Sequence, residues 1–183
     1  MKILPTALGG AYVIEPELLE DERGFFARTY CRDEYAKYSL NSDIAQCSIS
    51  FNLRTGTLRG MHFQTKPHEE IKVVRCTMGA IYDVIVDLRP GSLNFRQWFA
   101  VELSAQNRTM LYIPEGFAHG FQTLAENTEV FYQISQSYVP GSAQGIRWND
   151  PALAISWPFA NPFISERDRN FPLLPLAPSS SQQ

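Results

Sequence analysis

The sequence predicts an all-β protein, an antiparallel sandwich or small barrel, on three observations. Apolar and polar side chains alternate with a period of two residues from about residue 44 to residue 138. Aromatic residues, which favour strands, make up 13% of the chain. Eleven glycines and twelve prolines interrupt the chain at short intervals, so we expect many short strands.

The expected elements follow in chain order. Helix is scarce, and the one candidate is a helix of one or two turns over residues 33–38 with Asp33 as its N-cap. Residues 72–77 and 80–88 flank Met78-Gly79, a glycine turn that predicts a hairpin. Further strands, each bounded by Gly, Pro, Asn or Ser, are predicted at 98–103, 109–113, 119–124 and 129–135.

The length of 183 residues fits one domain, which we expect over residues 1–175. A chain of this size buries roughly 70% of its surface on folding, so it needs no disulfide or metal to hold it together. The last residues, 176–183, are rich in Pro, Ser and Gln and predict a flexible C-terminal tail.

The net charge and the cysteine content limit which partners and which cellular compartment fit this chain. Sixteen Lys and Arg against nineteen Asp and Glu give a net charge of −3, which argues against a nucleic-acid partner. The three cysteines, Cys31, Cys47 and Cys76, form no CxxC pair, so neither a disulfide framework nor a zinc site follows. No apolar run reaches signal-peptide or membrane-span length, so we expect a cytoplasmic protein with no membrane partner.

A turn in the middle of the chain delivers a histidine to a strand. The segment 114–119, Pro-Glu-Gly-Phe-Ala-His, resembles the second cupin motif, and His119 is its histidine. The first cupin motif needs His-x-His and a glutamate around a metal, whereas this chain has His62-Phe63-Gln64. The metal site is incomplete, so we expect no bound metal. Without this proline-glycine context, the preferred interpretation of His119 would be a partly buried histidine that donates to a backbone carbonyl at a turn.

Polar groups also gather in the strand 56–64. Strict alternation puts Gly60 and His62 on one face and Arg59 on the other. Arg59 and His62 can therefore share a pocket only if Gly60 carries a β-bulge. The alternative is a solvated Arg59 and a hydrogen-bonded His62 in the core.

Three other polar residues have ordinary explanations when each is taken alone. Tyr132 shares a face with Val130 and Ile134 and points to the interior, as a core tyrosine does. Lys72 also shares a face with inward residues, but a lysine at a strand end more often extends its ammonium to solvent. Asp168 could be an exposed loop acid.

Taken together, these segments resemble one family in sequence order. The blocks are 21–26 (DERGFF), 56–64 (GTLRGMHFQ), 72–75 (KVVR), 83–89 (DVIVDLR), 114–121 (PEGFAHGF) and 148–151 (WNDP). The chain resembles the dTDP-4-dehydrorhamnose 3,5-epimerase family from about residue 3 to residue 172. The resemblance implies a cupin-type jelly roll with few short helices, a homodimer, a sugar-nucleotide substrate and no cofactor.

The resemblance also implies catalytic roles. Such an enzyme removes a proton next to a ketone and returns one to the opposite face, which requires two acid–base groups and a cation for the enolate oxygen. The histidine matching His62 is the base, Asp168 orients it, and Tyr132 protonates the other face. Lys72 supplies the cation.

For the sugar nucleotide, the resemblance assigns Arg23, Phe26, Gln46 and Arg59 to the diphosphate, sugar and base surroundings. Tyr138 would stack on the base, and His119 would line the sugar pocket. Two positions of the binding region depart from the family pattern: Arg28 stands where Glu is common, and Ser48 where Asn is common. The expected substrate is dTDP-4-keto-6-deoxyglucose, and these departures leave the nucleotide and sugar open.

Three alternatives remain. One is a related keto-sugar-nucleotide epimerase or isomerase, for example CDP-linked or acting at C3 or C5 alone. Another is a metal-dependent cupin oxygenase or isomerase that uses His62, His119 and a carboxylate. The last is a catalytically silent sugar-binding cupin.

Overall fold

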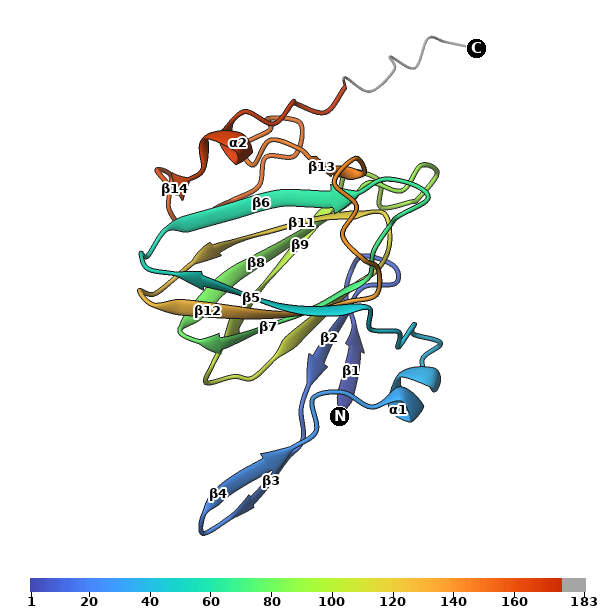
Figure 1. The fold of residues 1–183 in the computed structure, drawn as a ribbon, viewed down its shortest axis with the longest axis vertical. Coiled ribbons are helices and arrows are strands. Elements are labelled where there is room, and N and C mark those ends of the chain that lie inside the picture. Colours follow the sequence, from blue (N-terminus) through green and yellow to red (C-terminus); the bar gives the residue numbers. More distant parts are fainter. Residues whose placement is uncertain (176–183) are drawn as a thin grey trace.

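A computed structural model describes residues 1–175 and places two antiparallel sheets face to face (Figure 1). The first sheet has the order β1 (Lys2–Pro5), β2 (Tyr12–Glu15), β10 (Met110–Ile113), β7 (Lys72–Met78), β12 (Thr128–Ile134) and β5 (Gln46–Asn52). The second has the order β13 (Ala143–Gly145), β6 (Thr57–Gln64), β11 (Phe117–Thr123), β8 (Ala80–Asp87) and β9 (Trp98–Ser104), with β14 (Phe163–Ile164) parallel to β6. The all-β sandwich is confirmed.

The main core lies between the two sheets. Val74 and Val130 of the first sheet are fully buried, as are Ile81, Ile85 and Phe121 of the second. Strand alternation sends these side chains inward from both sheets, which is how two half-apolar surfaces bury each other.

The strands expected after residue 97 are confirmed as β9 to β12, each within two residues of its expected bounds. The sequence did not predict β1 and β2 or the separate two-stranded sheet of β3 (Leu18–Asp21) and β4 (Gly24–Ala27). Strands β3 and β4 expose most of their side chains. They therefore lack the apolar and polar alternation that marks a half-buried strand.

The expected hairpin of residues 72–77 and 80–88 is wrong. Strands β7 and β8 exist, but they pair with different neighbours and belong to different sheets. Gly79 is the single residue between them, at φ +74°, and a Cβ there would collide with Thr128. Because one residue is too short for a hairpin loop, Gly79 turns the chain from one layer of the sandwich to the other.

The expected cap of the first helix is also wrong. Helix α1 spans Arg32–Ala36, so Asp33 lies inside its first turn and Cys31 occupies the N-cap position. Cys31 makes no side-chain capping bond. The acidic Asp33 and Glu34 of the first turn still suit the positive end of the helix.

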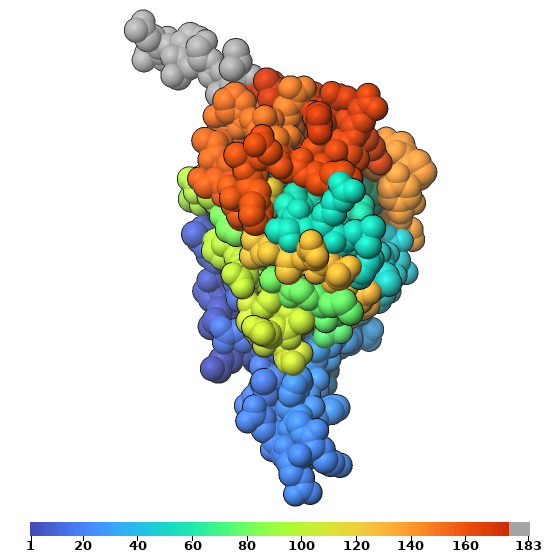
Figure 2. Space-filling view, turned by 90° about the vertical axis from the view of Figure 1, so that its left-hand side faces the viewer, coloured from blue at the N-terminus to red at the C-terminus, as the bar shows by residue number. Residues whose placement is uncertain are grey.

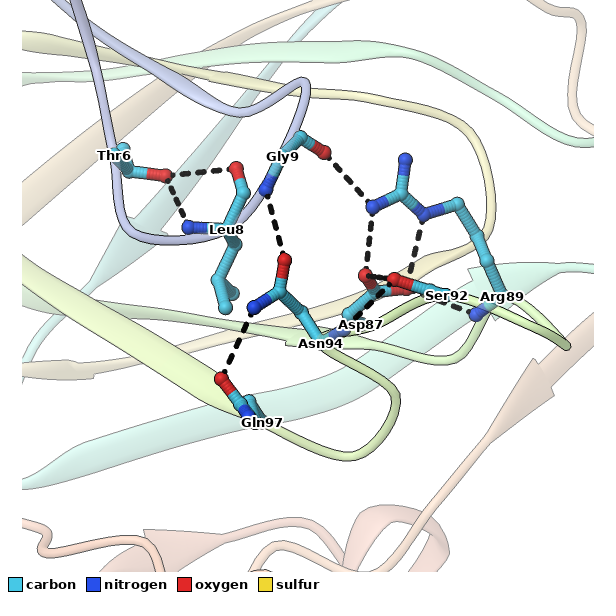
Figure 3. Close-up of polar contacts among 8 residues, drawn as sticks. All are labelled: Thr6, Leu8, Gly9, Asp87, Arg89, Ser92, Asn94 and Gln97. Carbon is cyan, nitrogen blue, oxygen red and sulfur yellow. Dashed lines mark hydrogen bonds and ion pairs between the residues drawn. The ribbon is translucent and has the colours of Figure 1, made fainter.

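A polar network joins the loop after β1 to the loop after β8 (Figure 3). Asp87 accepts bonds from the Arg89 guanidinium and from Ser92 Oγ, and Arg89 Nη2 also donates to the Gly9 carbonyl at 2.8 Å. Burial alone would raise the pKa of Asp87, but the bonds from Arg89 and Ser92 outweigh it and hold this pKa below its usual range. The network holds the loop after β1 and the loop after β8 together at one end of the sandwich.

The β3–β4 hairpin projects from the body of the sandwich (Figures 1 and 2). It exposes four large apolar side chains, Leu18, Leu19, Phe25 and Phe26. The only aromatic or cation–π contact of the hairpin within the described residues is the Arg108 guanidinium over the Phe25 ring, at 4.3 Å.

No helix of the described residues is both long and apolar enough to cross a membrane. The three cysteines are free thiols. The tail expected at residues 176–183 lies outside the described residues.

Candidate active site

The site is built around a β-bulge in β6. His62 pairs with His119 and Arg59 with Phe121, so Gly60 and Met61 together face the single residue Gly120. The extra residue shifts the alternation by one position and brings Arg59 and His62 to the same face. Gly60 has φ +143°, and a Cβ there would lie 2.5 Å from the Gly120 Cα, so the bulge requires glycine. The structure thus meets the condition under which the sequence allowed Arg59 and His62 to share a pocket.

A cavity of about 320 Å³ opens between the two sheets. Eight of the expected site residues line it: Gln46, Ser48, Arg59, His62, Lys72, His119, Tyr132 and Tyr138. They come from β5, β7 and β12 in the first sheet, from β6 and β11 in the second, and from the segment after β12. The two layers therefore supply opposite walls of one cavity.

His62 and Asp168 form a hydrogen-bonded pair at this cavity. His62 Nε2 lies 2.9 Å from Asp168 Oδ1, and Gly60 N donates to Asp168 Oδ2 at 3.1 Å. Burial alone would raise the pKa of Asp168, but the bond from His62, the Gly60 amide and the Arg167 charge hold it below its usual range. Asp168 is a buried partner of His62, and its interpretation as an exposed loop acid is wrong.

This pairing sets the protonation pattern of His62. A carboxylate only accepts, so Nε2 carries the hydrogen and the lone pair lies on Nδ1. The His62 side chain is 40% exposed, whereas that of Asp168 is 8% exposed. His62 thus presents a basic nitrogen that solvent or a ligand can reach, while its orienting carboxylate stays shielded.

Tyr132 enters from β12 on the other sheet. Its ring packs against the main core and stands edge-on to the His119 ring, with 6.1 Å between the centroids. Burial and the negative charge of Asp83 raise the pKa of Tyr132, against a smaller opposite effect of Arg59. Tyr132 is therefore protonated at neutral pH and can donate a proton.

His119 forms a second buried pair. Its Nε2 lies 2.8 Å from Asp83 Oδ1, and both side chains are almost fully buried. The alternative of a bond to a backbone carbonyl does not apply, because the neighbouring strand β8 offers a carboxylate instead. The pair fixes the ring beside Tyr132.

Lys72 remains inside the cavity and does not extend its ammonium to solvent, which was the ordinary alternative for a lysine at a strand end. Its ammonium pairs with Glu70 Oε1 at 2.8 Å, and only 10% of the side chain is exposed. A buried ammonium is stable where a carboxylate offsets its desolvation, and Glu70 supplies that carboxylate.

Two arginines line the cavity with their guanidinium groups. Arg59 is held by Nε donation to Asn52 Oδ1 at 2.8 Å. Arg167 belongs to helix α2, Glu166–Arg169, and was not singled out in the sequence. The sequence feature that could have pointed to Arg167 is its position directly before Asp168.

Arg23, Phe26 and Arg28 do not line this cavity. Arg23 and Phe26 lie on the projecting hairpin, and the Arg23 side chain pairs with Asp21. Arg28 pairs with Glu34 Oε1 at 3.1 Å on the surface of the same chain. Within one subunit, these three expected binding residues are separate from the rest of the site.

One nitrogen of each cupin-motif histidine is engaged by a carboxylate. His62 and His119 each direct Nε2 to a carboxylate, and the Gln64 amide bonds to Glu70 and to two backbone carbonyls. Among residues 1–175, no three His, Cys, Asp or Glu side chains gather as metal ligands.

Comparison with known proteins gives a consistent result. The family model for dTDP-4-dehydrorhamnose 3,5-epimerase matches residues 5–175. The chain is 40% identical to the dTDP-4-dehydrorhamnose 3,5-epimerase of Salmonella typhimurium over 178 residues, which is 97% of each chain. It is 36% identical over 175 residues to the dTDP-4-dehydrorhamnose 3-epimerase of Streptomyces niveus, covering 95% of this chain and 84% of that one.

Solved structures agree. The crystal structure of the Bacillus anthracis dTDP-4-dehydrorhamnose 3,5-epimerase with TDP and PPi bound superposes with a TM-score of 0.92 at 42% identity, covering 94% of this chain and 99% of that one. The Legionella pneumophila enzyme in complex with dTDP-4-keto-L-rhamnose has a TM-score of 0.88 at 36% identity, covering 94% and 92%. The cupin-type jelly roll expected from the sequence is confirmed.

Proposed function

The chain belongs to the dTDP-4-dehydrorhamnose 3,5-epimerase family and is an isomerase, and from this premise we propose which residues perform its reaction. The substrate is dTDP-4-keto-6-deoxyglucose, and the product is dTDP-4-keto-L-rhamnose. The observation that carries the proposal is the cavity between the sheets, with the His62–Asp168 pair on one wall and Tyr132 on the other.

The two walls suit an epimerisation. The protons on C3 and C5 are acidic because each carbon is next to the C4 ketone. His62 removes such a proton through Nδ1, and Tyr132 returns a proton to the opposite face of the sugar ring. Asp168 keeps the imidazole oriented and stabilises the imidazolium. Since His62 and Tyr132 belong to different sheets, a sugar ring bound between them has one group on each face.

Lys72 stabilises the intermediate. Proton removal leaves negative charge on the C4 oxygen, and a positioned cation in the cavity lowers the energy of this enolate. The ketone itself serves as the electron sink, so the proposed reaction uses no nicotinamide, flavin or metal.

The nucleotide binds toward the mouth of the cavity. Arg59 and Arg167 suit the diphosphate, because a guanidinium donates two hydrogen bonds to phosphate oxygens. Tyr138, which is 56% exposed, offers a ring face for the base beside Gln46 and Ser48.

Two apolar surfaces support a homodimer. The β3–β4 hairpin exposes Leu18, Leu19, Phe25 and Phe26, and the edge strand β5 exposes Ile49 and Phe51, with Leu53 just after it. An uncovered sheet edge with apolar side chains favours association. In a symmetric pair, the hairpin of one subunit can bring Arg23 and Phe26 to the cavity of the other. We therefore propose that each site uses both subunits.

Mixed dimers test this shared site. Co-expression of His62→Ala chains with Arg23→Ala chains is expected to restore about a quarter of the wild-type sites, because half of the dimers are mixed and each holds one site with both residues intact. Each variant alone is expected to be impaired. Activity is measured on the whole dimer population, and different tags on the two chains report the fraction of mixed dimers.

The control combines His62→Ala with Tyr132→Phe, both on the same cavity. No site in that mixture has both residues, so no restoration is expected. Equal activity of the two mixtures, or a monomer in solution, contradicts the shared site.

The function is tested with deuterium. The protein is incubated with dTDP-4-keto-6-deoxyglucose in deuterated water after exhaustive EDTA treatment, and NMR locates the label. Label at both C3 and C5 is expected. Label at one carbon alone indicates a single epimerase, and activity that returns only with one metal ion favours the metal-dependent cupin.

The departures at Arg28 and Ser48 make a separate prediction. A cation at residue 28 in place of a carboxylate cannot accept hydrogen bonds from sugar hydroxyls. The double change Arg28→Glu with Ser48→Asn is therefore expected to raise kcat/KM for dTDP-4-keto-6-deoxyglucose relative to a CDP-linked or deoxygenated analogue. If the ratio of kcat/KM for the two substrates is the same in the double variant and the wild type, these residues have no role in specificity.

The cytoplasmic location stays a prediction of the sequence.

A further inference from the structure

Gln64 stands where a metal-binding cupin has its second imidazole, and its amide holds several groups together. Nε2 donates to Glu70 Oε2 at 3.2 Å and to the carbonyls of His68 and Ser137 at 3.1 and 3.3 Å. Oε1 accepts from Val139 N at 2.8 Å. The side chain is buried, so these bonds fix its orientation. Gln64 thus connects Glu70 with the segment 137–139.

Glu70 is the one carboxylate among the described residues that line the cavity. Its two oxygens are divided: Oε1 pairs with Lys72 Nζ at 2.8 Å, and Oε2 accepts from Gln64. The Glu70 and Lys72 side chains are 11% and 10% exposed. The cavity also contains the cations Arg59 and Arg167, so Glu70 supplies the only negative charge of the lining that balances them.

We propose that Glu70 is a positioning residue that aims the Lys72 ammonium at the enolate oxygen, with Gln64 fixing Glu70 in place. An ammonium has three donors, and Glu70 takes one, so two are left for the substrate. A lysine side chain has four rotatable bonds, and one short ion pair restricts where its nitrogen can lie. This inference rests on the proposed role of Lys72.

Gln64 extends the arrangement to the nucleotide end of the cavity. Ser137 and Val139 flank Tyr138, and both are bound by the Gln64 amide. The buried Gln64 side chain therefore sets the position of the Lys72 ammonium, through Glu70, and also the position of the segment 137–139, which carries the Tyr138 ring.

Glu70→Gln tests the proposal, since it keeps the size of the side chain and removes its charge. We expect kcat to fall about tenfold while KM changes less than about twofold, because the ammonium acts on the enolate more than on the bound substrate. Glu69→Gln is the matched control: it removes the same charge one residue away and does not line the cavity. It is expected to leave both constants unchanged.

A double-mutant cycle identifies the residue through which Glu70 acts. In a Lys72→Ala background, Glu70→Gln is expected to add little to the loss of kcat, because the ammonium that Glu70 positions is already gone. The proposal is overturned if the losses of kcat caused by the two single changes multiply in the double variant. It is also overturned if Glu70→Gln leaves kcat unchanged, or if this change alters KM alone. If Lys72→Arg and Lys72→Ala both retain wild-type kcat, the failure lies in the proposed role of Lys72 instead.

Gln64→Leu extends the test to the other end of the cavity. It is expected to lower kcat and also raise KM, because Tyr138 loses its anchored segment along with Glu70. A lowered kcat with unchanged KM contradicts the connection to Tyr138. Thermal melting monitors folding, and if Gln64→Leu does not fold, Glu70→Gln and its cycle decide the proposal.

Discussion

His62→Ala is expected to abolish deuterium incorporation at both reacting carbons. The change removes the basic Nδ1, and positioned general bases contribute about 10²- to 10⁴-fold to the rate. It also removes the partner of Asp168, whose Oδ1 lies 2.9 Å from the imidazole. NMR of the recovered sugar nucleotide after long incubation in deuterated water gives the measurement.

His68→Ala is the matched control, because His68 is the third histidine of the chain and its side chain does not line the cavity. Its variant is expected to exchange like the wild type. Exchange at the wild-type rate in His62→Ala would show that another group is the base.

Asp168→Asn refines the same result. The expected loss is smaller than for His62→Ala, because the carboxylate orients the imidazole and stabilises its charge without transferring the proton itself.

The lowered pKa of Asp168 also has a consequence for stability. Because folding lowers the pKa of this carboxyl, its ionised form stabilises the native state at every pH above the unfolded pKa. This contribution to the free energy of unfolding is lost as the pH falls through the folded pKa.

Tyr132→Phe is expected to separate exchange from inversion. His62 can still remove a proton and return deuterium to the same face, so label enters while the configuration is retained. Inversion is expected to fall by about 10²-fold or more, because the donor on the opposite face is gone. The Phe ring keeps the edge-on contact with His119 and the packing against the core, so folding should persist.

The comparison of two rates in one sample gives the result: label uptake by NMR and product formation by chromatography. Tyr82→Phe is the control, since it removes a hydroxyl from a half-buried tyrosine outside the cavity. If Tyr132→Phe lowers label uptake and inversion by the same factor, His62 and Tyr132 do not have the separate roles of proton removal and proton return.

Much of the fold, and eight of the side chains that line the cavity, could be predicted from the sequence. Period-two alternation predicted β9 to β12, because a strand with one buried face must alternate. The proline-glycine turn placed His119 on β11, and Gly60 indicated the bulge that lets Arg59 and His62 share a cavity. The resemblance of ordered motifs supplied the catalytic roles, which no single residue carried.

Other features depended on contacts between segments that are distant in the chain. Alternation assigns a face to each residue but no partner strand, so the sequence could not show that β7 and β8 lie in different sheets. Asp168 is 106 residues from His62, and only the packing of α2 beside β6 makes it a buried partner.

The sequence by itself therefore determined the fold class and showed where a bulge would have to lie, because these depend on local side-chain alternation and on the residue types present. The tertiary structure alone decided the charge partners. Lys72 stays buried because Glu70 offsets the desolvation of its ammonium, and the β3–β4 hairpin stands apart because its apolar side chains find too little to cover them within this chain. Both outcomes depend on which groups meet in space, which local pattern does not specify.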